Sequence, residues 1–281
     1  MASEGVLLVV GTPIGNLGDL SPRAAEALAG AGVVACEDTR RTRALLSAAG
    51  IPAAGKRLVA VHEHNEAEQA GAVAAMVAAG QRVALVTDAG MPTLSDPGRR
   101  VVAAVAGAGL QVVVVPGPSA AVSALAASGL PAERFAFEGF LPRKGGDRRR
   151  RLAAVAGEQR TVVLYEAPHR VRATVADLVA ACGPDRPVAL ARELTKVHEE
   201  VWRGTLAAAA EWLDEGEPRG EFVLVVGGAP RPEVTDAEIE RALAARLGAG
   251  DDRRAAVAAV TLELDVAKRR VYELSLRVAG A

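Results

Sequence analysis

The segment RVALVTDAGMPTLSDPG, residues 82–98, joins a short apolar run to a loop rich in glycine, proline, carboxylate and hydroxyl side chains. The run 82–86 suits a buried strand, while Asp96 followed by Pro97 predicts the N-cap and first position of a helix. A loop between the carboxyl end of a strand and the amino end of a helix is where open α/β sheets bind ligands. Because this loop carries carboxylates, we expect a ligand with hydroxyl groups or positive charge.

Apolar runs of the same kind recur on both sides of this segment and alternate with alanine-rich helical patterns. In the first half of the chain this alternation predicts a mainly parallel sheet, with further strands at 6–10, 33–36, 58–61 and 111–115. The second half predicts another set of strands, at 135–137, 161–165, 188–191, 200–202 and 222–226. Residues 195–199 leave no room for a crossover helix, so part of this second sheet should be antiparallel.

The expected fold is α/β, with two α/β domains and a small helical tail. We place the domains at 1–117 and 118–228, and the helical module at 229–281, after the glycine- and proline-rich linker 227–232. In the tail, Thr235 with Glu238 has capping-box spacing, and Asp265 should start the last helix. Three short helices with a basic last one resemble a helix-turn-helix module. A small bundle that only packs on the main body is an equal alternative.

Other helix starts also carry cap signals. Ser21 precedes Pro22, and Asn65 stands three residues before Glu68, which is capping-box spacing. Asp38 has two open interpretations: a cap for the helix that starts at Thr39, or a residue facing the predicted ligand site.

Composition bounds the function without deciding it. The 281 residues carry a formal net charge of −1, so the overall field does not argue for a polyanionic partner. Two isolated cysteines form neither a zinc site nor a disulfide framework, and His62-x-His64 lacks a third ligand, so we expect no metal. The amino terminus lacks a signal peptide, and glycines and prolines break the longest apolar stretch, 101–130. We therefore expect a cytoplasmic protein without a membrane span.

Local basic clusters are more informative than the net charge. One cluster follows the first strand of the second half, and another lies in the last helix of the tail. A solvated helix face is the ordinary explanation of such runs, but arginine also suits phosphate contacts. The predicted RNA contacts are Arg143, Lys144, Arg148, Arg149, Lys268, Arg269 and Arg270.

Five predicted strands end in decorated loops, and these ends should meet at one crevice. The first loop, GTPIGNLG at 11–18, lacks the spacing of a dinucleotide-binding G-x-G-x-x-G fingerprint. The others are CEDTR at 36–40, the loop at Asp88, VPGPSA at 115–120 and YEAPHR at 165–170.

These motifs, in this order and together with ARELTK at 191–196 and GEFVLV at 220–225, closely resemble the tetrapyrrole methylase superfamily. Within it they resemble the branch that methylates small-subunit ribosomal RNA, over about residues 5–226 and in the helical tail. The resemblance implies two α/β domains, S-adenosylmethionine bound between them, and a homodimer. Corrin and porphyrin methylases carry Gly-x-Gly-Pro-Gly in the first loop. The presence of Thr12-Pro13-Ile14 there argues against a tetrapyrrole substrate.

The resemblance further implies methyl transfer to the ribose 2′-hydroxyl of a cytidine in the decoding centre of 16S rRNA, on the small ribosomal subunit. A sulfonium donor brings its own leaving group, so orientation and proton removal suffice and no metal is required. Two alternatives stay open. One is a methylase of a tetrapyrrole or of a translation-factor histidine derivative, and the other is a non-catalytic RNA-binding factor with the same fold.

The resemblance to the family also implies roles for individual residues. The implied donor contacts are Thr12, Asp88, Met91, Ser119, Ala120, Tyr165, Phe222 and Val223. A ribose hydroxyl is a weak acid, so a base or a stabilising cation must lie within hydrogen-bond reach. Among the polar residues at strand ends, Glu37 is the leading base candidate, and Arg40 and Lys196 are the expected phosphate or oxyanion partners.

Overall fold

We describe the protein from a computed structural model of the chain, in which residues 5–230 and 234–278 are described. The chain divides into two compact units, Met1–Ala229 and Pro230–Ala281. The first unit holds two five-stranded sheets, and the described residues of the second form helices and no strand. The α/β fold class predicted from the sequence is confirmed.

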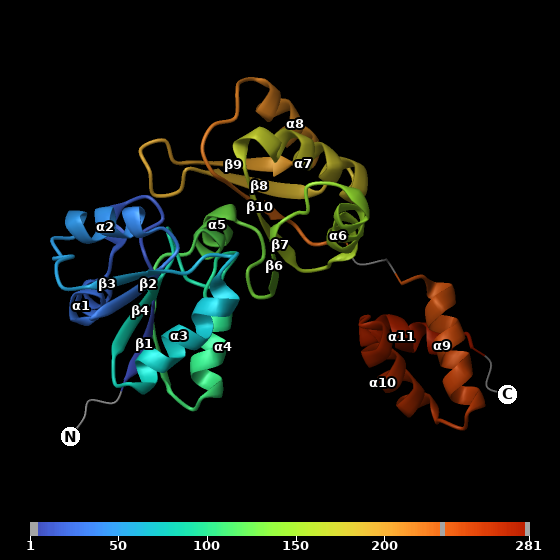
Figure 1. The fold of residues 1–281 in the computed structure, drawn as a ribbon. Helices are drawn as coiled ribbons and strands as arrows, with labels where there is room; N and C mark the ends of the chain where they lie inside the picture. The colour runs from blue at the N-terminus through green and yellow to red at the C-terminus, as the bar shows by residue number, and fades with distance from the viewer. Residues whose placement is uncertain (1–4, 231–233, 279–281) are drawn as a thin grey trace. The chain divides into compact units, whose positions relative to one another are not determined.

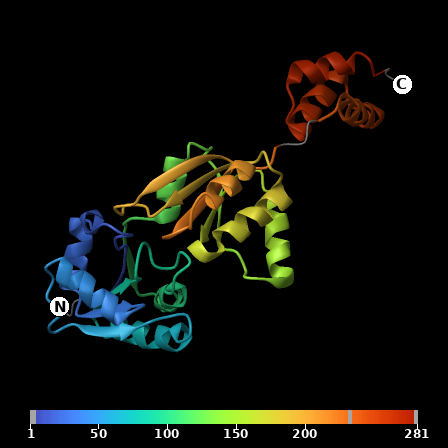
Figure 2. The same cartoon turned by 90° about the horizontal axis from the view of Figure 1, so that it is seen from above.

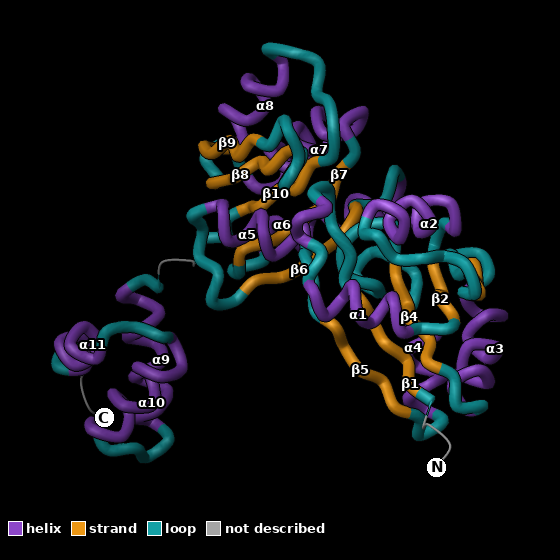
Figure 3. Tube along the Cα trace, turned by 90° about the vertical axis from the view of Figure 1, so that its left-hand side faces the viewer, coloured by secondary structure: helices purple, strands orange, loops and turns teal. Residues whose placement is uncertain are grey.

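The first sheet is parallel throughout, with strand order β3-β2-β4-β1-β5. Its strands are β1 (Val6–Val10), β2 (Val33–Cys36), β3 (Arg57–Ala60), β4 (Arg82–Val86) and β5 (Gln111–Val115). In Figure 3, β5, β1, β4 and β2 lie side by side. Alternate residues of the strands pack against helices on opposite faces. One face carries α1 (Pro22–Gly30) and α2 (Thr39–Ala48), and the other carries α3 (Glu66–Ala78) and α4 (Arg99–Gly107) (Figure 1).

The second sheet is mixed, with strand order β6-β7-β10-β8-β9. Only the β6–β7 pair is parallel, and the antiparallel β8–β9 hairpin confirms the prediction from residues 195–199. The strands are β6 (Phe135–Phe140), β7 (Thr161–Glu166), β8 (Pro187–Arg192), β9 (Glu200–Thr205) and β10 (Phe222–Val226). Helix α5 (Ala120–Ser128) covers one face (Figure 2). The other face is covered by α6 (Gly145–Gly157), α7 (Pro168–Cys182) and α8 (Leu206–Asp214).

Several helix starts follow from the predicted caps. The Ser21 side chain accepts a hydrogen bond from Ala24 N at the start of α1, and Asp38 accepts one from Arg40 N at the start of α2. The short 3-10 helix η1 (Leu17–Asp19) is capped by Asn16 in the same manner. Asp38 is therefore a helix cap, since a free backbone donor in the first turn is satisfied by its carboxylate.

The expected capping box at Asn65 is wrong. Asn65 does occupy the N-cap position of α3, but its side chain makes no cap hydrogen bond. Its amide instead accepts from His62 N at 2.8 Å and donates to Ala60 O at 3.0 Å, closing the turn that leaves β3. A local backbone partner thus replaces the helix partner, as is common for asparagine.

The expected helix start at Asp96 and Pro97 is also wrong. Helix α4 begins at Arg99 after Gly98, whose φ of 128° interrupts the chain between Pro97 and the helix. The cap comes from a distant residue, because Glu66 Oε1 accepts from Gly98 N at 2.9 Å and Arg100 N at 2.6 Å. Asp96 therefore belongs to the loop and is free for another role.

The second unit is a three-helix bundle with its own core. Its helices are α9 (Asp236–Gly248), α10 (Arg253–Leu264) and α11 (Lys268–Ser275), which pack through Ile239, Leu243, Val257, Val260 and Val271. The predicted capping box of Thr235 and Glu238 is confirmed. The prediction for Asp265 is wrong: this residue ends α10 in a left-handed conformation, with φ of 48°. Residues 231–232 of the expected linker lie outside the described residues.

No helix in the described residues has the length and apolar character needed to cross a membrane. The cysteines Cys36 and Cys182 are both free thiols.

Candidate functional site

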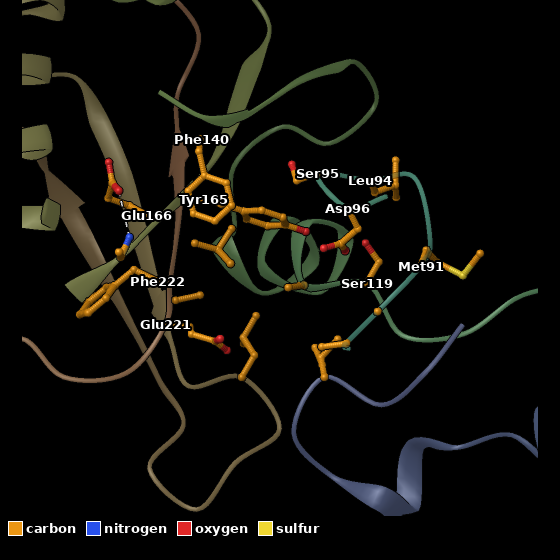
Figure 4. Close-up of a pocket in the computed structure, with 18 of the residues that line it drawn as sticks. Met91, Leu94, Ser95, Asp96, Ser119, Phe140, Tyr165, Glu166, Glu221 and Phe222 are labelled. Atoms are coloured by element: carbon orange, nitrogen blue, oxygen red, sulfur yellow. Dashed lines mark hydrogen bonds between the residues drawn. The ribbon is translucent and has the colours of Figure 1, made fainter. Parts of the chain in front are cut away.

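A cavity of about 450 Å³ opens where the two sheets of the first unit meet. The first sheet contributes the loops that follow β1 and β4, through Ile14 and residues 89–96, and the segment after β5 contributes Ser119 and Ala120. The second sheet contributes the ends of β6, β7, β8 and β10 (Figure 4). A volume of this order is typical of a small-molecule site. Four of the five strand-end loops that the sequence singles out therefore line one cavity, and the loop 36–40 does not.

Six of the eight expected donor contacts line this cavity, namely Met91, Ser119, Ala120, Tyr165, Phe222 and Val223. The other two, Thr12 and Asp88, are not among its lining residues. The Thr12 side chain is fully buried and donates to Thr87 O at 3.2 Å, and its backbone pairs with Gly90. Thr12 thus fixes the loop after β1 to the loop after β4, a positioning role.

Close backbone packing explains the glycine of the first loop. A Cβ atom on Gly11 would lie 2.6 Å from Gly117 Cα and 2.6 Å from Met91 Sδ. Three strand-end loops therefore meet at this point with no room for a side chain. Because Gly11 has no side chain, the loops that carry Gly11, Met91 and Gly117 can pack directly against one another.

Asp88 lies beside the cavity within a carboxylate cluster. Its Oδ1 accepts from Asp38 N at 3.2 Å, its Oδ2 lies 3.4 Å from Arg41 Nη1, and its own backbone N–H points to Glu37 Oε2 at 3.5 Å. Burial raises the pKa of Glu37, and the charge of Asp88 raises it further. Neither Glu37 nor Asp88 lines the cavity.

Asp96 does line the cavity, whereas the sequence alone predicts it as the start of a helix. Burial raises the pKa of Asp96 to about 7, and the negative charges of Glu37 and Asp88 add to this effect. Among the described residues its carboxylate has no hydrogen-bond partner that would hold it ionised. Its neighbours Thr93 and Ser95 have φ of 79° and 65°. Such values are costly for residues with a β-carbon and cluster at functional sites.

Aromatic side chains form the opposite wall. The Tyr165 hydroxyl accepts a hydrogen bond from Ala121 N at 3.2 Å, which satisfies a free donor in the first turn of α5. Burial raises the pKa of this tyrosine. The rings of Phe137 and Phe140 pack edge-on against Tyr165, with centroids 5.1 Å and 5.6 Å away. Tyr165 therefore serves the core and the cavity together.

The YEAPHR motif supplies a buried anchor that sequence reasoning missed. The Glu166 carboxylate is fully buried, accepts from Thr174 Oγ1 at 2.6 Å and lies 3.2 Å from Arg170 Nε. These contacts fix the start of α7, where His169 lines the cavity. A glutamate directly after an apolar strand, with arginine four residues later, was the available signal, since such spacing favours an ion pair.

The other two expected catalytic residues, Arg40 and Lys196, are not lining residues of the cavity. Arg40 is exposed and pairs with Asp38 at 2.9 Å. Lys196 Nζ lies 2.8 Å from Glu193 Oε1 and 3.0 Å from Glu221 Oε2, and Glu221 lines the cavity. Lys196 is thus held by two carboxylates, one of which lines the cavity, while Arg40 is paired with Asp38, the N-cap of its own helix.

Some of the expected RNA contacts are exposed, and others are engaged in contacts within the protein. The structure corrects the prediction for Arg148, because its side chain is only 12% exposed, lies 2.7 Å from Asp177 and donates to Pro142 O and Thr174 Oγ1. Arg143, Lys144 and Arg149 are exposed and make no ion pair with a described residue. In α11, Arg269 pairs with Glu273 and Arg270 with Asp236, whereas Lys268 is exposed.

The part of the chain that the structure describes contains no cluster of three or more side chains that could hold a metal ion. The rings of His62 and His64 are 6.0 Å apart between centroids, in an edge-on arrangement.

Comparison with known proteins matches this architecture. A family model described as Tetrapyrrole (Corrin/Porphyrin) Methylases matches residues 6–210. Ribosomal RNA small subunit methyltransferase I of Synechocystis sp. is 43% identical over 277 residues, which cover 98% of each chain. The protein of that name from Mycobacterium tuberculosis is 48% identical over 251 residues, covering 89% of this chain and 88% of the relative.

Among solved structures, uroporphyrin-III C-methyltransferase from Thermus thermophilus, complexed with S-adenyl homocysteine, is 25% identical with a TM-score of 0.54. The match covers 79% of this chain and 97% of that one. The match to the Synechocystis relative covers nearly the whole chain, the helical tail included, whereas this structural match leaves about a fifth of the chain uncovered. The chain therefore belongs to the tetrapyrrole methylase family and, within it, to the group of ribosomal RNA small subunit methyltransferase I.

Proposed function

We propose that this protein transfers a methyl group from S-adenosylmethionine to the ribose 2′-hydroxyl of a cytidine in the decoding centre of 16S rRNA, acting on the small ribosomal subunit. The observation that carries the proposal is the cavity between the two sheets, in a chain that is 43% identical to a ribosomal RNA small subunit methyltransferase I over 277 residues. A cytoplasmic location and a homodimer are part of the proposal. Light scattering behind size-exclusion chromatography measures the dimer directly.

The lining of the cavity suits the proposed donor. Met91, Ala120 and Val223 offer apolar surface to an adenosine, while Ser119 and Asp96 add polar atoms. A largely apolar pocket with a few polar groups is typical of cofactor sites. The relative from Thermus thermophilus, solved with S-adenyl homocysteine, supports the assignment.

The bound donor would supply an electrophilic methyl group together with its own leaving group. The protein then has two tasks, which are to hold the ribose hydroxyl in line and to accept its proton. Orientation of this kind contributes about 7 to 11 kcal/mol to catalysis in well-aligned systems. The loops held together at Thr12 and Gly11, and the start of α7 anchored by Glu166, suit that task.

For the proton we propose Asp96 in place of Glu37. Asp96 lines the cavity and Glu37 does not. A carboxylate with pKa near 7 is a stronger base at neutral pH than an ordinary aspartate, and about half of it is ionised there. Glu37 and Asp88 would act through Asp96, because their charges raise its pKa. Lys196 stays the proposed cation at the edge of the site.

The test uses small ribosomal subunits that lack the modification, S-adenosylmethionine labelled in its methyl group, and nucleoside analysis of the digested RNA. We expect label on the 2′-oxygen of one cytidine. Label on a base, on protein or on a tetrapyrrole would contradict the proposal and favour another member of the family.

Calorimetry with S-adenosylhomocysteine separates the enzyme from a non-catalytic RNA-binding protein of the same fold. We expect heat of binding and a higher melting temperature at saturating ligand, because a ligand that binds only the folded state stabilises it. Absence of both effects would contradict the methyltransferase assignment.

A further inference from the structure

Strand β6 changes the face it presents partway along its length. Phe137 pairs with Val163 of β7, but the next pair is Gly139 with Leu164, so Glu138 is an extra residue in a β-bulge. Side chains alternate between the faces of a sheet, and one inserted residue moves every following side chain to the opposite face. Phe140 consequently pairs with Tyr165 and shares its face with Phe137, the face that leads to the cavity.

The bulge is held from several directions. Gly139 has φ of 61°, and a Cβ on it would lie 2.7 Å from Ser95 Oγ, in the loop that carries Asp96. On the other side, Arg151 Nε lies 2.7 Å from Glu138 Oε2. The register shift is therefore a built feature that sets β6 against the loop after β4.

Phe140 is exposed although its neighbours in sequence are not. Its side chain is 52% exposed, whereas Gly139 and Leu141 are buried. The backbone beyond it is fixed by two arginines, since Arg170 donates to Leu141 O at 2.8 Å and Arg148 to Pro142 O at 3.0 Å. In Figure 4 Phe140 lies beside Tyr165, across the cavity from Ser95 and Asp96. An aromatic ring held rigidly at the edge of a cavity is a ready contact surface.

Positive charge continues from this ring along the chain. Arg143 and Lys144 follow Phe140 by three and four residues, and Arg149 lies on the helix that they precede. All three are exposed and make no ion pair with a described residue. An exposed aromatic face beside unpaired cations is the combination with which proteins bind single-stranded RNA, the ring stacking on a base and the cations contacting phosphates.

We propose that Phe140 is a substrate-binding residue that stacks on a nucleobase of the RNA strand entering the cavity, with Arg143 and Lys144 contacting the adjoining phosphates. This proposal rests on the proposed function and names the residues that hold its substrate. Stacking accepts any base, so Phe140 would hold an unstacked nucleotide at the cavity mouth without selecting its sequence.

The experiment compares Phe140→Ala, Phe140→Leu and Phe140→Trp with the wild type on small subunits that lack the modification. We expect Phe140→Ala to raise KM for the subunits about tenfold. Phe140→Leu should have a similar effect, because it keeps apolar surface but loses the flat ring, whereas Phe140→Trp should stay within about threefold of the wild type. The Kd for S-adenosylhomocysteine, measured by calorimetry, should change less than twofold in all three variants.

Three outcomes would overturn the proposal. Wild-type KM in Phe140→Leu would mean that any apolar side chain serves and that no base stacks there. A Kd for S-adenosylhomocysteine that rises together with KM would place Phe140 in the donor site. Loss of dimer in Phe140→Ala, with KM otherwise unchanged, would make the ring a contact with a second copy of the chain.

Failure of the proposed function is visible separately. A wild type that binds S-adenosylhomocysteine but transfers no methyl group to the subunits contradicts the enzymatic assignment before any variant is compared. A melting temperature close to that of the wild type confirms that each variant folds, as expected for a half-exposed side chain.

Discussion

At the scale of single residues, Asp96 determines how the proposed reaction should depend on pH. The ionised form accepts the proton, so the rate should rise with pH and level off above about 7, the value to which burial raises the pKa of Asp96. Asp96→Asn should lower kcat by about 10² to 10⁴-fold and remove this limb of the profile. Single-turnover rates measured from pH 5.5 to 9 provide the check. Unchanged donor affinity separates a lost base from a lost donor contact.

Glu37 should tune this limb from outside the cavity. Its negative charge contributes to the raised pKa of Asp96, so Glu37→Gln should move the limb to lower pH while leaving the plateau rate near that of the wild type. Glu63→Gln, at an exposed carboxylate, is the matched control and should leave the profile in place. A plateau rate that collapses in Glu37→Gln would return Glu37 to the role of base.

The same carboxylate predicts a cost in stability. The pKa of Asp96 is about 7 in the folded protein against an ordinary value of 3.8, so the folded state binds the proton more tightly than the unfolded state. Stability from this site is therefore present below about pH 4 and is lost as pH rises through about 7. Asp96→Asn should melt at a higher temperature than the wild type at pH 8, and the difference should shrink at pH 5. Thermal unfolding at the two pH values tests this.

At the scale of elements, the bulge in β6 should be sensitive to a single methyl group. Gly139→Ala combines a left-handed backbone with a close approach to Ser95 Oγ, and the backbone strain alone costs about 1 to 3 kcal/mol. Gly129→Ala is the matched control, since Gly129 has φ of 76° but open space around it. Urea denaturation should show a larger loss of stability for Gly139→Ala. Equal losses would mean that the Ser95 contact relaxes without cost.

Helix α6 offers two adjacent arginines with opposite expected effects. Arg148 is buried in hydrogen bonds to Asp177, Thr174 and Pro142, so Arg148→Ala should lower the free energy of unfolding by about 1.5 to 3 kcal/mol. Arg149 is exposed, so Arg149→Ala should leave stability unchanged and raise KM for the subunits. Urea denaturation and subunit kinetics measure the two effects. A loss of stability in Arg149→Ala together with unchanged stability in Arg148→Ala would contradict these roles.

The strands were predictable because periodicity and apolar runs reflect burial, which is local information. The start of β3 shifted by one residue, yet every predicted strand exists. The errors at Asn65 and Asp96 have different causes. At Asn65 a nearby turn, through His62 N and Ala60 O, takes the side chain that was expected to cap the helix. At α4 the cap comes from Glu66, more than 30 residues away in the chain. Such long-range partners leave no mark in a local pattern.

The cavity was predictable as a place where strand-end loops meet, but some of its lining residues were not predictable from the sequence. Met91, Ser119 and Tyr165 carry family motifs and line it. Phe140 reaches it only because a bulge changes the alternation of β6, which a period-two pattern does not anticipate. Asp96 was assigned to a helix because Asp-Pro is a common helix start, and only Gly98 hinted that the helix begins later.

At the scale of the whole molecule, the helical tail should contribute to RNA affinity without contributing to donor binding. The tail forms its own compact unit, so the chain Met1–Ala229 should fold alone and bind S-adenosylhomocysteine as the full chain does. Residues 230–281 contain nine basic and nine acidic residues, and Arg269 and Arg270 are ion-paired. The electrostatic contribution should accordingly be small and should come mainly from exposed cations such as Lys268.

We therefore expect truncation after Ala229 to raise KM for small subunits and to reduce the slope of log KM against log salt concentration by about one to two, because each phosphate contact adds close to one to that slope. Lys268→Ala in the full chain should reproduce part of this change. An insoluble truncated protein would instead favour a tail that packs on the main body. A soluble truncated protein with unchanged KM and slope would show that RNA recognition resides in the first unit, which contains Phe140, Arg143 and Lys144.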